Sequence, residues 1–183
     1  MTKKAALLLA DGFEEIEATV PYDLLNRAGI RTDLISADNQ PVVTGNIGMH
    51  LTDLKMMKDT DFDQYDALVI PGGDGYVHLE NNPEVTALIE KFAKDPHKVL
   101  GAICAGACIP GKLGLYKDRD YTCVPGLNGD FGGTYEKVHA VLAGNIVSGI
   151  SVGGAFEFAL DLITVLQGKE KADEIASATF WKI

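Results

Sequence analysis

Cysteine is scarce in this sequence, with three among 183 residues. An odd and low count does not provide a disulfide framework. A chain of this length buries enough of its surface to fold without disulfides or a structural metal. We therefore expect Cys104, Cys108 and Cys123 to be free thiols in the reducing environment of the cytoplasm.

Positive charge and long apolar runs are lacking as well. The chain has 16 basic and 26 acidic residues, a net charge of -10, and no basic stripe of the kind that binds nucleic acid. The apolar run at 5–10 is too short for a membrane span and for the core of a signal peptide. We therefore expect neither nucleic acid nor membrane as a partner, and neither a cofactor nor a metal site.

Apolar segments alternate with helical patterns along the whole chain. Four apolar segments are expected to be parallel strands: 4–10, 31–36, 67–70 and 99–103. Helices are expected at 14–28, from 82 to 95, directly after Cys104, at 155–166 and at 169–179. Continuous apolar strands indicate a sheet that is covered on both faces.

Turn signals set the ends of several elements. Asn82 before Pro83 is a typical N-cap, and Pro21 is expected to kink the first helix. Hairpins are expected at 40–51 and around Gly144-Asn145. The stretch 116–133 gives no clear pattern. Together these features predict one doubly wound α/β domain over residues 1–183, with its site at the carboxyl ends of the strands.

Residues 99–106 carry the strongest chemical signal. An apolar segment runs directly into Cys104, with Ala102 two residues before it and Gly106 two residues after it. A nucleophile elbow needs small residues at these places because its turn is tight. The pattern predicts a Cys104 thiolate that is favoured by amide N–H groups and a helix dipole. The alternative is a buried structural cysteine.

The other two cysteines give weaker signals. Cys108 lies one helical turn after Cys104, and a bridge between consecutive turns fits disulfide geometry poorly. We interpret Cys108 as a small core residue and leave the role of Cys123 open.

Glycines at 72–75 end the neighbouring strand. Their backbone can approach a ligand closely, and the N–H groups of Gly73 and Ala105 are candidates for an oxyanion hole. Gly72 and His78 are candidates for lining the same site. An ordinary glycine-rich turn is the alternative.

One glutamate of the first helix is expected to face inward. Relative to the centre of the apolar stripe, Glu17 lies at roughly 60°, Glu14 at about 120° and Glu15 at about 140°. The stripe consists of Ile16, Val20 and Leu24. Glu17 is therefore the candidate partner of Cys104, whereas Glu14 and Glu15 are expected to face solvent. Bonding of Glu17 to loop N–H groups is the alternative.

These motifs together resemble the ThiJ/PfpI superfamily, and within it the branch of the parkinsonism-associated deglycase. The resemblance rests on Ala-Asp-Gly-Phe-Glu-Glu-Ile-Glu at 10–17, Arg-Ala-Gly-Ile at 27–30, Val-Ile-Pro-Gly-Gly at 69–73, Ala-Ile-Cys-Ala-Gly at 102–106 and Ala-Phe-Glu-Phe-Ala-Leu at 155–160. It implies a flavodoxin-like sandwich and a homodimer. It also implies Cys104 as nucleophile, Glu17 as the site glutamate, and the amides of Gly73 and Ala105 at the site.

The resemblance implies a redox-responsive cysteine whose oxidised form the glutamate stabilises, and a small-molecule substrate or oxidant. Some members act on small reactive carbonyls as glyoxalases or deglycases. The sequence departs from the family where other branches have histidine, since Ala105 and Val124 stand there, and Ile150 replaces a basic residue. Whether the protein is an enzyme therefore stays open. A non-enzymatic ligand-binding or protective module is the alternative, and a peptidase or amidase is the least supported.

Overall fold

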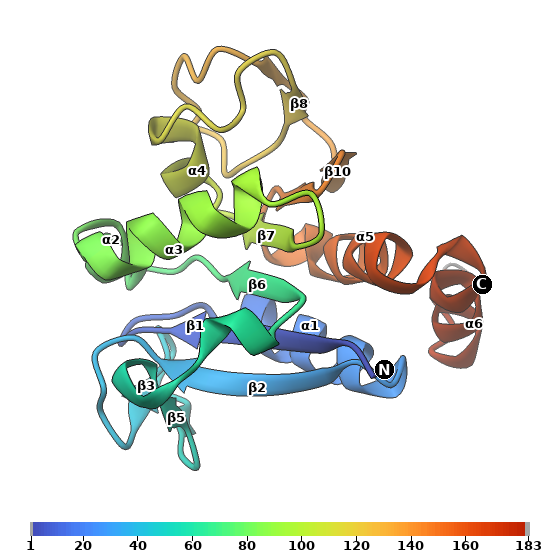
Figure 1. Cartoon of the computed structure of the whole chain (residues 1–183). Helices are drawn as coiled ribbons and strands as arrows, with labels where there is room; N and C mark the ends of the chain where they lie inside the picture. The colour runs from blue at the N-terminus through green and yellow to red at the C-terminus, as the bar shows by residue number, and fades with distance from the viewer. Residues whose placement is uncertain (1, 182–183) are drawn as a thin grey trace.

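The computed structural model describes residues 2–181, and its centre is one mainly parallel sheet. Within these residues seven strands lie in the order β10-β11-β7-β6-β1-β2-β5 (Figure 1). All neighbours are parallel except β10 and β11. The strands are β1 (Lys4–Leu9), β2 (Arg31–Ser36), β5 (Lys55–Met56), β6 (Ala67–Ile70), β7 (Val99–Ile103), β10 (Ala140–Ala143) and β11 (Ile146–Gly149).

Helices cover both faces of the sheet. One apolar cluster joins the sheet to α1 (Glu15–Arg27), α5 (Ala155–Gln167) and α6 (Lys169–Ala178). The other joins it to α2 (Tyr76–Glu80), α3 (Pro83–Lys94) and α4 (Cys108–Lys112). Along β1, Leu7 and Leu9 belong to the first cluster and Leu8 to the second, as alternation in a strand requires. The flavodoxin-like α/β fold expected from the sequence is confirmed.

Small elements connect the main ones. β3 (Val43–Thr44) and β4 (His50–Leu51) form an antiparallel hairpin, and β8 (Asp120–Tyr121) pairs parallel with β9 (Thr134–Tyr135). Short 3-10 turns lie at η1 (Met57–Asp59), η2 (Phe62–Gln64) and η3 (Val152–Gly154). In Figure 1 the β8 region lies at the top, far from β3 and β5 at the bottom.

The expected elements are present with small shifts of their ends. The four predicted strands are observed, and both predicted hairpins form, the second with its turn at Gly144, which has φ 69. The Asn82 side chain accepts hydrogen bonds from the N–H groups of Glu84 at 3.0 Å and Val85 at 3.4 Å, so the predicted N-cap is confirmed. α1 continues through Pro21 to Arg27 as one helix.

Several elements differ from the expectation, and three of them bear on the sheet or on the candidate site residues. β5 and β11 extend the parallel sheet, and α2 occupies 76–80, where a loop was expected. β5 has two residues and α2 has five, which is too short for a readable period. β11 was expected only as a hairpin strand, because its pairing with β7 is a long-range contact.

The strand order places the site. The chain runs from β1 to β2 on one side and then crosses to β6 and β7 on the other side. The carboxyl ends of β1 and β6 therefore flank a topological switch point, where doubly wound folds bind ligands. Residues 11–17, 71–75 and 104–106 meet at this edge. None of the helices formed by residues 2–181 has the length and apolar character that a bilayer crossing requires.

Candidate active site

Cys104 lies directly after β7 in a strained turn. Its backbone has φ 60, a left-handed conformation that is uncommon for residues with a side chain. Its N–H donates to the Gly149 carbonyl at 2.8 Å, which extends the pairing of β7 with β11 by one residue. The Ala107 N–H then donates to the Cys104 carbonyl at 3.2 Å and closes the turn. Such a turn lifts the sulfur off the sheet, as an elbow requires.

The turn requires a glycine two residues after the cysteine. A Cβ atom on Gly106 would lie 2.4 Å from the Pro71 carbonyl oxygen and 2.9 Å from that of Ile70. These are backbone atoms, so they cannot move aside cheaply. The steric reason for a small residue at 106 is therefore the end of the neighbouring strand β6.

Glu17 reaches the same edge from α1. Its side chain is fully buried, and its Oε2 accepts a hydrogen bond from the Gly72 N–H at 2.9 Å. A Cβ atom on Gly72 would lie 2.7 Å from Glu17 Oε2, 2.8 Å from the Ala105 nitrogen and 2.8 Å from Cys104 Cβ. Gly72 is thus the point where the predicted acid, the predicted nucleophile and one predicted amide come together.

The carboxyl of Glu17 and the thiol of Cys104 titrate as a pair. Burial raises the pKa of Glu17 to about 7, against the lowering effect of hydrogen bonds with Cys104 and the Gly72 N–H. Burial, the charge of Glu17 and the hydrogen bond with Glu17 raise the pKa of the Cys104 thiol to about 12. This direction is opposite to the one expected for a resting thiolate. Between about pH 7 and about pH 12 the pair therefore holds one proton, with Glu17 ionised and the thiol of Cys104 protonated.

The dipole of α4 acts on the Cys104 sulfur less directly than the sequence suggested. α4 begins at Cys108, so the turn 104–107 separates the sulfur from the first helical residue. The groups that lower the pKa of Cys104 are instead the Ser151 hydroxyl and the Ala105 N–H. Both groups stabilise negative charge on sulfur by hydrogen bonding.

Ser151 is a site residue that sequence reasoning missed. Its Oγ lies 3.8 Å from Cys104 Sγ, and it belongs to the loop between β11 and η3. The pairing of β11 with β7 brings this loop to the elbow. The sequence signals were its position after an apolar strand that was not assigned to this sheet, and the neighbouring Ile150, which stands where the resemblance implies a basic residue.

The remaining predicted site residues divide into two groups. Gly73 has φ 86, and its N–H has no hydrogen-bond partner within residues 2–181, so the amide is free to bind a substrate oxygen. Ala105 is buried, and its nitrogen lies against Gly72. His78, in contrast, lies on α2 with an exposed side chain. Among the described residues no histidine hydrogen-bonds to Cys104 or Glu17.

The predicted orientation of Glu15 and Ile16 is wrong. Glu15 is only 8% exposed, and its Oε1 accepts hydrogen bonds from the N–H groups of Ile47 at 2.8 Å and Met49 at 3.3 Å. Burial raises the pKa of Glu15, but hydrogen bonds from its own N–H and those of 47–49 outweigh burial and lower it overall. Ile16, expected in the core, is 46% exposed. The β3–β4 hairpin packs on the helix start and reverses the pattern there.

The other cysteines lie in the apolar core. Cys108 is 1% exposed and Cys123 is fully buried, so the interpretation of Cys108 as a core residue is confirmed. All three cysteines are free. Within the described residues, no group of three or more histidine, cysteine, aspartate or glutamate side chains could hold a metal ion.

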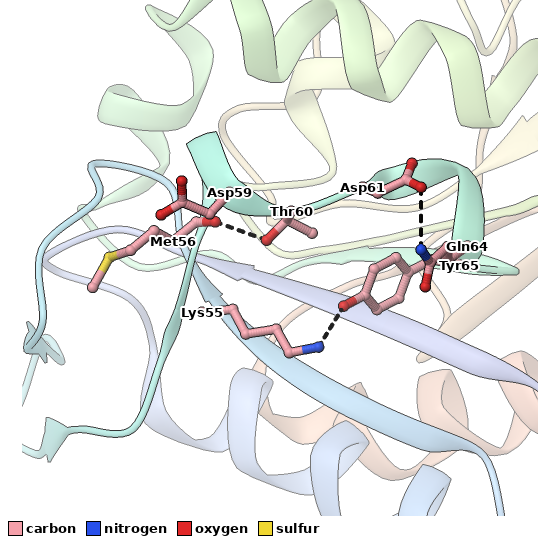
Figure 2. Close-up of a pocket in the computed structure, with 7 residues that line it drawn as sticks. All are labelled: Lys55, Met56, Asp59, Thr60, Asp61, Gln64 and Tyr65. Atoms are coloured by element: carbon pink, nitrogen blue, oxygen red, sulfur yellow. Dashed lines mark hydrogen bonds between the residues drawn. The ribbon is translucent and has the colours of Figure 1, made fainter.

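A separate pocket lies beside β5, the last strand in the order of the sheet. Figure 2 shows its lining residues, with the Lys55 Nζ donating to the Tyr65 hydroxyl at 3.2 Å. Lys55 also donates to Asp33 at 2.7 Å, so the Lys55 ammonium group is already bonded within the protein. The pocket shares no residue with the surroundings of Cys104. It is lined by Lys55, Met56, Asp59, Thr60, Asp61, Gln64 and Tyr65.

The fold and the site define a class of protein. An α/β sandwich with a cysteine elbow and a buried glutamate at its switch point is typical of the superfamily that the motifs resemble. The DJ-1/PfpI family model matches residues 3–165. The chain belongs to the DJ-1/PfpI family.

Relatives and solved structures cover the whole domain. The glutathione-independent glyoxalase DJR-1.2 of Caenorhabditis elegans is 30% identical, over 94% of each chain. A mutant of a DJ-1 superfamily protein from Salmonella typhimurium is 30% identical, with a TM-score of 0.89 over 100% of each chain. Oxidized DJ-1 of Toxoplasma gondii is 26% identical, with a TM-score of 0.90 over 100% of each chain.

The paired titration predicts how the reactivity of Cys104 depends on pH. Alkylation of Cys104 should speed up as pH rises through about 7, because only the ionised Glu17 can accept the thiol proton. In Glu17→Gln the rise near 7 should vanish and begin at a higher pH. The measurement is the alkylation rate of the Cys104 peptide by mass spectrometry across a pH series.

Glu14→Gln is the matched control. The charge of Glu14 contributes to raising the pKa of Glu17, so its removal should keep the rise and move its midpoint to slightly lower pH. A Glu17→Gln protein that still shows a step near 7 would assign that step to the thiol itself.

Proposed function

We propose that the protein is a cysteine-dependent, stress-related enzyme that acts on small reactive carbonyl compounds without glutathione. The observation that carries this proposal is the close approach of Glu17, Cys104 and the Ala105 nitrogen around Gly72. The glyoxalase name of the worm relative supports the substrate class.

The geometry supports a first chemical step. The Cys104 sulfur adds to the aldehyde carbon of an α-oxoaldehyde, and the new S–C bond forms as the electron pair of the C=O bond moves to oxygen. The thiol proton passes to the Glu17 carboxylate. We assign the developing oxyanion to the Gly73 and Ala105 N–H groups, and the stabilisation of negative charge on sulfur to Ser151, whose Oγ lies 3.8 Å from Cys104 Sγ. The step needs no histidine.

The activity can be tested directly. The wild-type protein should consume a small α-oxoaldehyde in the absence of glutathione, and Cys104→Ser should fall to background. Ser151→Ala should lose roughly tenfold, since one hydrogen bond to a charged group is removed. The measurement is the loss of the aldehyde over time.

His78→Ala is the matched control and should keep full activity, because His78 is exposed on α2. Equal rates for wild type and Cys104→Ser would reject the enzymatic proposal. They would favour the second candidate, a non-enzymatic protective module. The lack of a histidine bonded to Cys104 is the observation that speaks for this candidate.

We also propose that Cys104 responds to peroxide. Among the three thiols it is the one that is not fully buried. Mild peroxide should add two oxygen atoms to Cys104 first, giving a sulfinate that a protonated Glu17 can hydrogen-bond. Peptide mass spectrometry checks this, and oxidation of Cys108 or Cys123 ahead of Cys104 would contradict it.

The surface near α1 supports a homodimer. Ile47 is 82% exposed, Met49 is 44% exposed and Ile16 is 46% exposed. Glu15 holds the backbone of 47–49 against the helix start, which brings these exposed apolar residues near one another, and we propose that they meet a second copy of the chain. Sedimentation should show a dimer for the wild type and a monomer for Ile47→Asp; a monomeric wild type would rule the dimer out.

We place the protein in the cytoplasm, the compartment that keeps three free thiols reduced. Cell fractionation with an antibody to the protein tests this, and recovery in an oxidising compartment would contradict it. The single domain over 1–183 likewise stays a prediction, which one cooperative unfolding transition would support.

A further inference from the structure

Two of the three cysteines are brought near each other by the fold, on the backbone side of the elbow and not among the side chains of the proposed site. Cys108 is the first residue of α4, and Cys123 follows β8 by two residues. Cys108 Sγ donates to the Cys104 carbonyl oxygen and Cys123 Sγ donates to the Val124 carbonyl oxygen, and both are free thiols. They are 15 positions apart in the chain and are 1% and 0% exposed. The proposed reaction of Cys104 uses neither of them.

The fold holds the two thiols together through one backbone oxygen. Cys108 Sγ lies 3.8 Å from the Cys104 carbonyl oxygen and donates to it. The Val124 N–H donates to the same oxygen at 3.4 Å. The start of α4 and the segment after β8 are therefore fixed side by side at the elbow backbone. Tyr135 adds a further bond, from its hydroxyl to the Cys123 carbonyl at 3.3 Å.

The pair lies on the other face of the sheet from the Cys104 side chain. Cys108 and Cys123 belong to the apolar cluster with α3 and α4. The Cys104 side chain packs on the cluster with α1 and α5. Cys108 shares its face with stacked aromatic rings, since Tyr116 and Tyr121 have centroids 4.7 Å apart. The pair and the Cys104 side chain therefore pack in different apolar clusters, on either side of the elbow backbone.

We propose that Cys108 and Cys123 form a second redox site, a buried dithiol that closes to an intramolecular disulfide by exchange with a low-molecular-weight disulfide. The Cys123 sulfur attacks one sulfur of the reagent, the S–S bond of the reagent breaks, and the leaving thiolate takes up the proton that Cys123 releases. The Cys108 thiol then attacks the Cys123 sulfur of the mixed disulfide and releases the second thiol. Two protein thiols are oxidised, and one reagent disulfide is reduced to two thiols.

The disulfide has a mechanical consequence. It ties α4 to the segment after β8 and closes a loop of about 15 residues, which restricts the unfolded chain. We expect the melting temperature to rise by roughly 6–12 °C. The segment tied down, 109–122, includes the first part of the stretch 116–133, in which the sequence shows no clear pattern.

The experiment uses the native full-length protein and hydroxyethyl disulfide as the reagent. After incubation, free thiols are alkylated, and peptides are analysed without reduction. We expect a Cys108–Cys123 cross-linked peptide, with loss of two hydrogen atoms, in both wild type and Cys104→Ser. Because both thiols are buried, the cross-link should form more slowly than Cys104 reacts with the same reagent.

Cys108→Ser and Cys123→Ser should each lose the cross-link and the rise in melting temperature. If either variant fails to fold, the wild type and Cys104→Ser still decide the question. A pair that stays reduced under native conditions, a cross-link that includes Cys104, or one that forms only in denaturant would overturn the proposal. Cys104→Ser separates the two proposals, because it should lose carbonyl consumption and keep the disulfide.

Discussion

The site depends on the absence of a side chain at Gly72. Three groups from two parts of the chain approach the position where a Cβ would lie, each within 2.8 Å: Glu17 from α1, and Cys104 and the Ala105 amide directly after β7. Any larger residue would push the carboxyl away from the sulfur. The end of the same strand, β6, also packs against Gly106. Because Gly106 has no Cβ, there is room for the Pro71 carbonyl. The end of β6 thus sets both the turn of the elbow and the distance between acid and thiol.

Burial then gives the acid and the thiol their joint behaviour. A carboxyl at the surface would be ionised well below neutral pH, and the pKa of a distant thiol would not depend on the charge of that carboxyl. Enclosed together, the two groups hold one proton between them over a wide range of pH. The site therefore carries a single negative charge at rest, on the Glu17 carboxylate, and transfer of the thiol proton to Glu17 would move that charge to sulfur. Ser151 and the Ala105 N–H favour sulfur, whereas the Gly72 N–H favours the carboxylate of Glu17.

Much of this arrangement could be predicted from the sequence, and what could not depends on long-range contacts. The strands were readable because they are continuous apolar runs, and the elbow was readable because small residues flank Cys104. Glu17 was placed correctly by helical geometry alone. The same geometry failed for Glu15, because the hairpin that bonds to it is 32 residues away in the chain. Ser151 was missed for a related reason, since only the pairing of β11 with β7 brings it to the sulfur. The raised thiol pKa depends on enclosure from several elements, which no local pattern encodes.

The left-handed backbone at Cys104 lowers the stability of the fold at the residue that supplies the reactive sulfur. Residues with a Cβ pay of order 1–3 kcal/mol for such a conformation, and glycine does not. A chain optimised only for folding would therefore have glycine at 104 and would form the same turn more easily. The cysteine makes the domain less stable than its architecture allows, and the rest of the sandwich has to supply the difference. Engineering that raises thermal tolerance by relaxing this turn would remove the reactive atom at the same time.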